Sequence, residues 1–226
     1  MNYEIIGDVM PILKFTLERN EVIKSQAGAM KWMDNSIEMN TKMKGGVSGF
    51  FKRKVMGESG FLNVFKSNTD GSNLVFGHSY PGHIIPIDIE KNSMICQRRA
   101  FLCGTENIEL EIAFQKKLGS GLFSGEGFIL QKLEGAGTAF VELDGEIINM
   151  ELKSDEIIKV ETGSVGMYEP SVNMDIERVK GFSNLLFGGE GMFLTTLQGP
   201  GKVWLQTMPI QSHAGELKNY ISSNGN

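Results

Sequence analysis

The sequence is poor in the residues from which most active sites are built. It contains 3 His and 2 Cys among 226 residues. The two cysteines, Cys96 and Cys103, are too few for a disulfide framework, and we interpret them as the free thiols of an intracellular protein. No run of about 18 apolar residues occurs, and the first residues lack the basic and apolar regions of a signal peptide. We therefore expect a cytoplasmic protein without a transmembrane segment.

Catalytic sequence motifs are absent as well. The chain has no Gly-x-Ser-x-Gly elbow, no Walker loop and no dinucleotide fingerprint. Residues 119–127 are rich in glycine but lack the Lys and the following helix of a phosphate-binding loop, so we interpret them as a β loop. His78 and His83 flank a turn and His213 lies in the tail, a spacing that fits no metal motif. The sequence favours a non-enzymatic protein with no metal and no cofactor.

The net charge is −5, which disfavours nucleic-acid binding by the surface as a whole. Residues 42–54 are the exception, because they hold five cations and no acid. This loop could bind nucleic acid or an anionic membrane surface. Alternatively, it is a solvated loop whose Phe side chains pack on a neighbouring unit or subunit, and we favour this interpretation. The residues that carry the hypothesis are Lys42, Lys44, Phe50, Phe51, Lys52, Arg53 and Lys54.

The positive signal in the sequence is a pattern that occurs three times. Residues 13–18, 85–90 and 148–153 alternate between apolar and polar positions, and each is followed by an Asn or Asp marker and a short apolar run. In the first copy, alternation predicts a strand with Leu13, Phe15 and Leu17 on its buried face. A period of 60 to 70 residues, roughly, predicts an array of three β units.

Each copy also contains a Gly-Glu pair that precedes a second apolar run. The three repeat-equivalent carboxylates are Glu58, Glu126 and Glu190. They could form a ring that holds a cation. We favour a structural interpretation, in which the glycine bends the strand and the glutamate caps backbone N–H groups.

Glycine-rich turns at 70–73, 135–137 and 199–201 close each copy and predict hairpins. At least four or five strands per copy make the fold all-β. We expect three β-sandwich units packed around a pseudo-threefold axis, in a single domain spanning residues 1–210. The predicted units are 8–80, 81–143 and 144–208, followed by a C-terminal tail, 211–226.

Several motifs together resemble a known family. They are 26–34 (QAGAMKWMD), 45–46 (GG), 57–59 (GES), 81–82 (PG), 135–137 (GAG) and 199–207 (GPGKVWLQT). From about residue 3 to residue 208, in this order, they resemble the bacterial branch of the altered-inheritance-of-mitochondria family. The resemblance implies three units of a fold related to the trp RNA-binding attenuation protein, a short variant of the double-stranded β-helix. It supplies no catalytic residues. RNA binding does not transfer, because this surface is acidic.

Three hypotheses about function follow from these observations. The first is a non-enzymatic scaffold or binding protein that acts as a homo-oligomer, with an unknown protein as a further partner. The second is binding of nucleic acid or an anionic membrane through the basic loop 42–54. The third is a metal-dependent enzyme on a cupin-like barrel, which the scarcity of His disfavours.

Overall fold

The computed structural model describes residues 1–42, 62–77, 80–116, 128–178 and 193–210, together with 212–214 and 217. These residues form 19 strands and a single turn of 3-10 helix, η1 (Thr162–Ser164), with helical residues at 210, 212–214 and 217 of the tail. The predicted all-β fold is confirmed.

The strands form four antiparallel sheets, which we name A to D. Sheet A contains, in spatial order, β1 (Asn2–Ile6), β2 (Ile12–Leu17), β7 (Ser72–Gly77) and β4 (Met30–Met33). Sheet B contains β5 (Ile37–Lys42), β6 (Leu62–Ser67), β3 (Val22–Ser25), β10 (Phe101–Thr105), β13 (Thr138–Asp144) and β8 (Gly82–Asp88). Sheet C contains β11 (Ile108–Lys116), β12 (Phe128–Gly135), β9 (Met94–Gln97), β16 (Val165–Tyr168), β19 (Gly201–Gln206) and β14 (Ile147–Leu152). Sheet D contains β15 (Ile157–Glu161), β18 (Phe193–Gln198) and β17 (Asn173–Arg178).

Three consecutive segments pair their six strands in the same way. We call β2–β7 the first segment, β8–β13 the second and β14–β19 the third. In each, the sixth strand lies between the first and the third, and the fifth lies between the second and the fourth. Sheets B and C each join half of one segment to half of the next, through the pairs β3·β10 and β9·β16. These pairings connect neighbouring segments in a row, and the predicted pseudo-threefold axis stays a prediction.

Each segment contributes three strands to one sheet and three to the next, which we call its two half-sheets. A core lies between these two half-sheets. Leu13, Phe15 and Leu17 are fully buried, as the alternation predicted. They pack with Phe65 of sheet B, and the same cluster takes in Phe140 of the second segment. A second core lies between sheets B and C and a third between sheets C and D. The cores therefore extend across the boundaries between segments.

The glycine-rich turns do not make hairpins, and this prediction is wrong. The turn at 70–73 leads from β6 in sheet B to β7 in sheet A, and the corresponding turns of the other two segments also change sheet. Positive φ values still explain the glycines: Gly135 has φ 105°, and a Cβ there would lie 2.0 Å from the carbonyl oxygen of Asn107. Glycine thus permits a close approach between strands rather than a two-residue hairpin.

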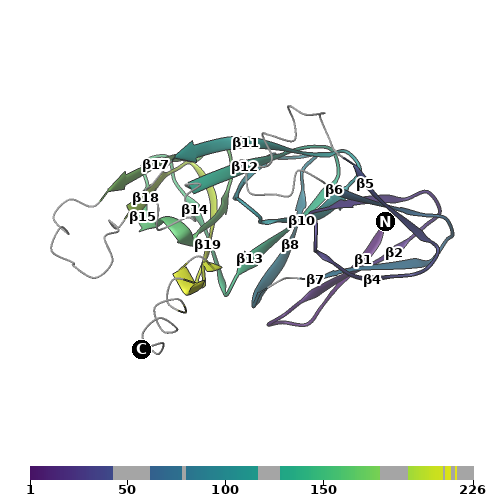
Figure 1. Ribbon diagram of the computed structural model, residues 1–226. Helices are drawn as coiled ribbons and strands as arrows, with labels where there is room; N and C mark the ends of the chain where they lie inside the picture. Colours follow the sequence, from purple (N-terminus) through teal and green to yellow (C-terminus); the bar gives the residue numbers. More distant parts are fainter. Residues whose placement is uncertain are drawn as a thin grey trace, which may run out of the picture.

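The molecule is elongated, with the first and third segments at opposite ends (Figure 1). Strands β1, β2, β4 and β7 lie at one end, and β15, β17 and β18 lie at the other. Sheets B and C occupy the middle, where the second segment connects the two ends.

Candidate functional site

Most residues singled out from the sequence lie outside the described part of the chain. This applies to Glu58, Glu126 and Glu190 and to the basic loop from Lys44 to Lys54. Lys42 is the last residue of β5. The carboxylate ring and the basic surface therefore stay predictions.

The histidine of β8 bonds to the backbone of a neighbouring turn. His83 Nδ1 lies 2.9 Å from the carbonyl oxygen of Gly145, and its Nε2 lies 3.8 Å from the carboxylate of Glu146. Across the described ranges, no three His, Cys, Asp or Glu side chains converge as metal ligands would. Nor do those ranges include a helix long and apolar enough to cross a membrane.

Two acidic side chains that the sequence analysis missed are buried on β13. Gln26 donates a hydrogen bond to Glu142 Oε1 at 2.7 Å, and the backbone N–H of Ile210 donates one to Asp144 Oδ2 at 3.2 Å. Loss of solvent raises the pKa of Glu142 to about 7, helped by the negative charge of Asp144. Desolvation likewise raises the pKa of Asp144 to about 6. These groups can hold protons near neutral pH.

The position of Glu142 carries a different residue in each segment, and it is polar in the second and third. Register aligns it with Gly77 of β7 and with Gln206 of β19, since these residues pair with Ile84, Ile12 and Ile147. Gln206 donates from Nε2 to the carbonyl of Gly163 at 3.0 Å and accepts from the backbone N–H of Asp144 at 2.9 Å. The amide of Gln206 thus satisfies backbone groups, whereas the carboxylate of Glu142 accepts from the side chain of Gln26.

The two cysteines are free thiols, as predicted, and both are buried. Burial raises the pKa of the Cys103 thiol, and the charge of Glu142 raises it further. A thiol in such surroundings is a weak nucleophile, because the reactive species is the thiolate.

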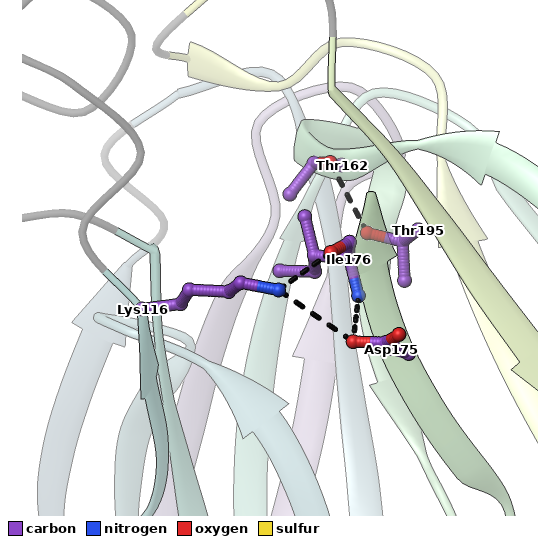
Figure 2. A network of polar contacts seen from close by, with 5 residues as sticks. All are labelled: Lys116, Thr162, Asp175, Ile176 and Thr195. Carbon is purple, nitrogen blue, oxygen red and sulfur yellow. Dashed lines mark hydrogen bonds and ion pairs between the residues drawn. The ribbon is translucent and has the colours of Figure 1, made fainter. Parts of the chain in front are cut away.

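A polar network ties the second segment to the third at the outer edges of sheets C and D (Figure 2). Lys116, the last residue of β11, donates to the carbonyl of Ile176 at 2.6 Å and lies 3.6 Å from Asp175 Oδ1. Nearby, the hydroxyl of Thr195 donates to that of Thr162, which donates to the carbonyl of Phe193. The hydroxyl chain ends on backbone, so it satisfies buried polar atoms.

Paired strands form a joint at each boundary between segments. At the first joint Ser25 of β3 lies opposite Cys103 of β10, and at the second Cys96 of β9 lies opposite Met167 of β16. All four side chains are fully buried. The neighbouring segment therefore shields these positions from solvent.

At the two ends of the row of segments, the equivalent strand positions are more exposed than at the joints. Sheet A ends at β4, where Trp32 is 50% exposed, and sheet D ends at β15, where Val160 is half-buried. Exposed large apolar side chains also gather on the N-terminal strand β1 and the turn that follows it. They include Tyr3, Ile5, Ile6, Val9 and Met10.

Residues 3–208 match the family model described as mitochondrial biogenesis AIM24. The chain belongs to the AIM24 family. The resemblance noted in the motifs is thereby confirmed over nearly the whole length that carries them.

Relatives of this AIM24 protein include bacterial proteins. An uncharacterised protein of Streptococcus pyogenes serotype M6 is 26% identical, and the match covers 96% of this chain and 89% of the relative. A protein of Streptococcus pyogenes solved by X-ray crystallography has 25% identity and a TM-score of 0.77, covering 97% of this chain and 99% of that one. The similarity therefore includes all three segments of the AIM24 fold described above.

Proposed function

We propose that this protein is a non-enzymatic scaffold or binding protein that works as a homo-oligomer. The observation that carries the proposal is the distribution of exposed apolar side chains. Of 13 large apolar residues exposed in the described ranges, nine belong to the first 80 residues. A surface of this kind is characteristic of protein contacts, because exposed apolar area is removed from water when it is covered.

The ends of sheets A and D support the same proposal. An edge strand presents unpaired N–H and C=O groups that another chain can pair with, and proteins usually cover such edges or protect them. Trp32, an aromatic residue of the kind enriched in interfaces, stands on one of these edges. The partner we propose is a second copy of this chain.

The hydrogen bonds of the buried acids support a structural role for these groups over a catalytic one. Glu142 accepts a hydrogen bond from Gln26, and Asp144 accepts one from the backbone of Ile210. Both groups thereby connect loops to sheet B, which is a structural task.

Light scattering coupled to size-exclusion chromatography tests the proposal directly. We expect a mass that is a multiple of the 24.9 kDa chain and that falls on dilution. A matched pair of variants tests which surface carries the contact. Ile5→Lys, on the exposed strand β1 at the apolar end, should lower the measured mass, whereas Ile112→Lys, an isolated exposed side chain on β11, should leave it unchanged. A mass of one chain at every concentration would overturn the proposal.

A further inference from the structure

Sheets A and D are the two halves of a sheet that is complete elsewhere in the molecule. Sheet B has the order β8-β13-β10, then β3-β6-β5, with the joint between β10 and β3. Sheet C has the same order for the next pair of segments, with its joint between β16 and β9. Sheet A supplies β2-β7-β4 with β1 added outside β2, and sheet D supplies β15-β18-β17. Among the described strands, sheet A lacks the second half and sheet D lacks the first half.

We infer that β15 of one copy pairs with β4 of a second copy, in the antiparallel register of the two internal joints. The inference rests on the proposed homo-oligomer and specifies how its copies meet. In Figure 1 the two strands lie at opposite ends of the elongated chain, so the partner of each edge is another molecule. The contact is head-to-tail and heterologous, the kind that builds rings or filaments.

A β-bulge defines the register on the β4 side. In the third strand of every segment the pairing shifts by one residue, between Met30 and Trp32 in β4 as between Phe101 and Cys103 in β10. The same shift occurs in β16 just before Met167. Trp32 therefore occupies the position that Cys103 and Met167 have at the internal joints.

The pairing of the other strand defines the register on the β15 side. Ser25, Cys96 and Val160 lie opposite Asn63, Gln131 and Thr195, respectively. Each of these three partners stands two residues before the repeated apolar position at Phe65, Leu133 and Leu197. Val160 therefore corresponds to Ser25 and Cys96.

These equivalences place Val160 opposite Trp32 of the second copy. The next pair follows from the internal joints, where Lys24 lies opposite Gly104 and Ile95 lies opposite Tyr168. It places Lys159 opposite Met33.

Charge agrees with this register. At the first joint the backbone N–H of Gln26 donates to the carbonyl of Leu102, the bulged residue of β10, at 3.1 Å. The corresponding residues at the open ends are Glu161 and Lys31, which carry opposite charges. Glu161 is exposed, and so is Lys31. The new joint therefore brings an ammonium group and a carboxylate to neighbouring positions.

Disulfide trapping in the full-length chain tests the register. We expect the variant Met33→Cys with Lys159→Cys to give covalent dimers and higher multiples under mild oxidation, because directly opposite residues have the separation that a disulfide requires. The control, Met33→Cys with Ile157→Cys, moves one thiol by two residues along the same face and should give much less product. Wild-type protein controls for the buried Cys96 and Cys103.

The possible outcomes distinguish the inferred pairing of β4 with β15 from the proposed homo-oligomer. Cross-linked multiples with the 33–159 disulfide found by peptide mass spectrometry support both. A chain that stays oligomeric by light scattering but gives no such link overturns the pairing and leaves the oligomer. Equal yield from the control, or a link within one chain, overturns the pairing as well. A monomer that cannot be trapped overturns both.

Charge exchange tests the same contact without cysteine. We expect Lys31→Glu and Glu161→Lys each to weaken self-association about tenfold, and the double variant to recover most of it. Far-UV circular dichroism verifies folding of each variant. Additive weakening in the double variant would contradict the inferred contact.

Discussion

The internal joints and the ends of the row present equivalent strand positions in different surroundings. Cys103 and Met167 are fully buried, whereas Trp32, at the equivalent position of the first segment, is 50% exposed. The same difference separates Cys96, which is fully buried, from Val160, which is half-buried. The difference lies in the presence of a neighbouring segment, because the strand pairing within each segment is the same. In this fold a segment completes its core with residues of the next one.

The largest expected effect comes from truncating a side chain at a joint. We expect Met167→Ala to lower the free energy of unfolding by about 2–5 kcal/mol, since it leaves a cavity in a fully buried site. The matched variant Trp32→Ala should cost less than about 1 kcal/mol in dilute protein. Urea denaturation measures both. Equal losses for the two variants would show that the joints and the ends do not differ in packing.

A pH-dependent effect distinguishes Glu142 from its equivalent in the third segment, Gln206. The folded protein raises the pKa of Glu142 from 4.5 to about 7, so it retains a proton that the unfolded chain releases. The contribution of Glu142 to stability therefore falls as the pH rises from about 4.5 to about 7 and is level above that. Glu142→Gln cannot ionise and should be more stable than wild type by about 3 kcal/mol above pH 7, with little difference below pH 4.5.

The control for this measurement is Glu146→Gln, because Glu146 lies in the exposed turn after β13. Urea midpoints at pH 4 and pH 8 give the comparison. A gain from Glu142→Gln that is the same at both pH values would contradict the role of desolvation. The groups that act on Glu142 are the charge of Asp144, the amide of Gln26 and the charge of Lys31.

Local patterns were sufficient to predict the strands, and the sheets depended on contacts that sequence patterns do not encode. Alternation identified Leu13, Phe15 and Leu17 as core residues because the period of a strand is a local property. The turn at 135–137 was recognised as a reversal, yet glycine does not specify which sheet the following strand joins. That choice depends on the packing of whole half-sheets.

The candidate site was less accessible from the sequence for a related reason. Glu142 and Asp144 alternate with Val141 and Leu143, so the strand looks half-exposed with its acids in solvent. Both faces of β13 are covered, because Phe140 packs in the first core and Val141 in the second. Only the arrangement of segments reveals that the acids are buried. The polar network around Lys116, in contrast, had a sequence signal. A basic residue ends the fourth strand of each segment, as Lys116 ends β11.

A smaller effect is expected where Lys116 connects the second segment to the third. Lys116→Met removes the hydrogen bond to Ile176 and should cost about 1 kcal/mol. The loss should appear as faster hydrogen exchange of the β17 backbone. Lys132→Met is the control, since Lys132 pairs with Glu134 within β12 and spans no boundary. Unchanged exchange in β17 would mean that Lys116 does not hold the two sheet edges together.

The smallest effect compares two lysines at equivalent positions, Lys24 and Lys159. Lys24 donates across the first joint to the carbonyl of Glu106, whereas Lys159 pairs with Glu177 on its own sheet. Both partners of the second pair are more than half exposed, so Lys159→Ala should cost at most about 0.5 kcal/mol in dilute protein and less in high salt. Lys24→Ala should cost more, because its partner belongs to the next segment.

The stability costs of Lys24→Ala and Lys159→Ala should become similar when a second copy covers β15. The residue of the first segment that corresponds to Glu106 is Asn35, two positions after Met33. Lys159 of one copy can then donate to the carbonyl of Asn35 of the next, as Lys24 does within the chain. The cost of Lys159→Ala, measured by thermal unfolding, should therefore grow with protein concentration while the cost of Lys24→Ala stays constant. A cost of Lys159→Ala that does not change with concentration would mean that β15 remains an open edge.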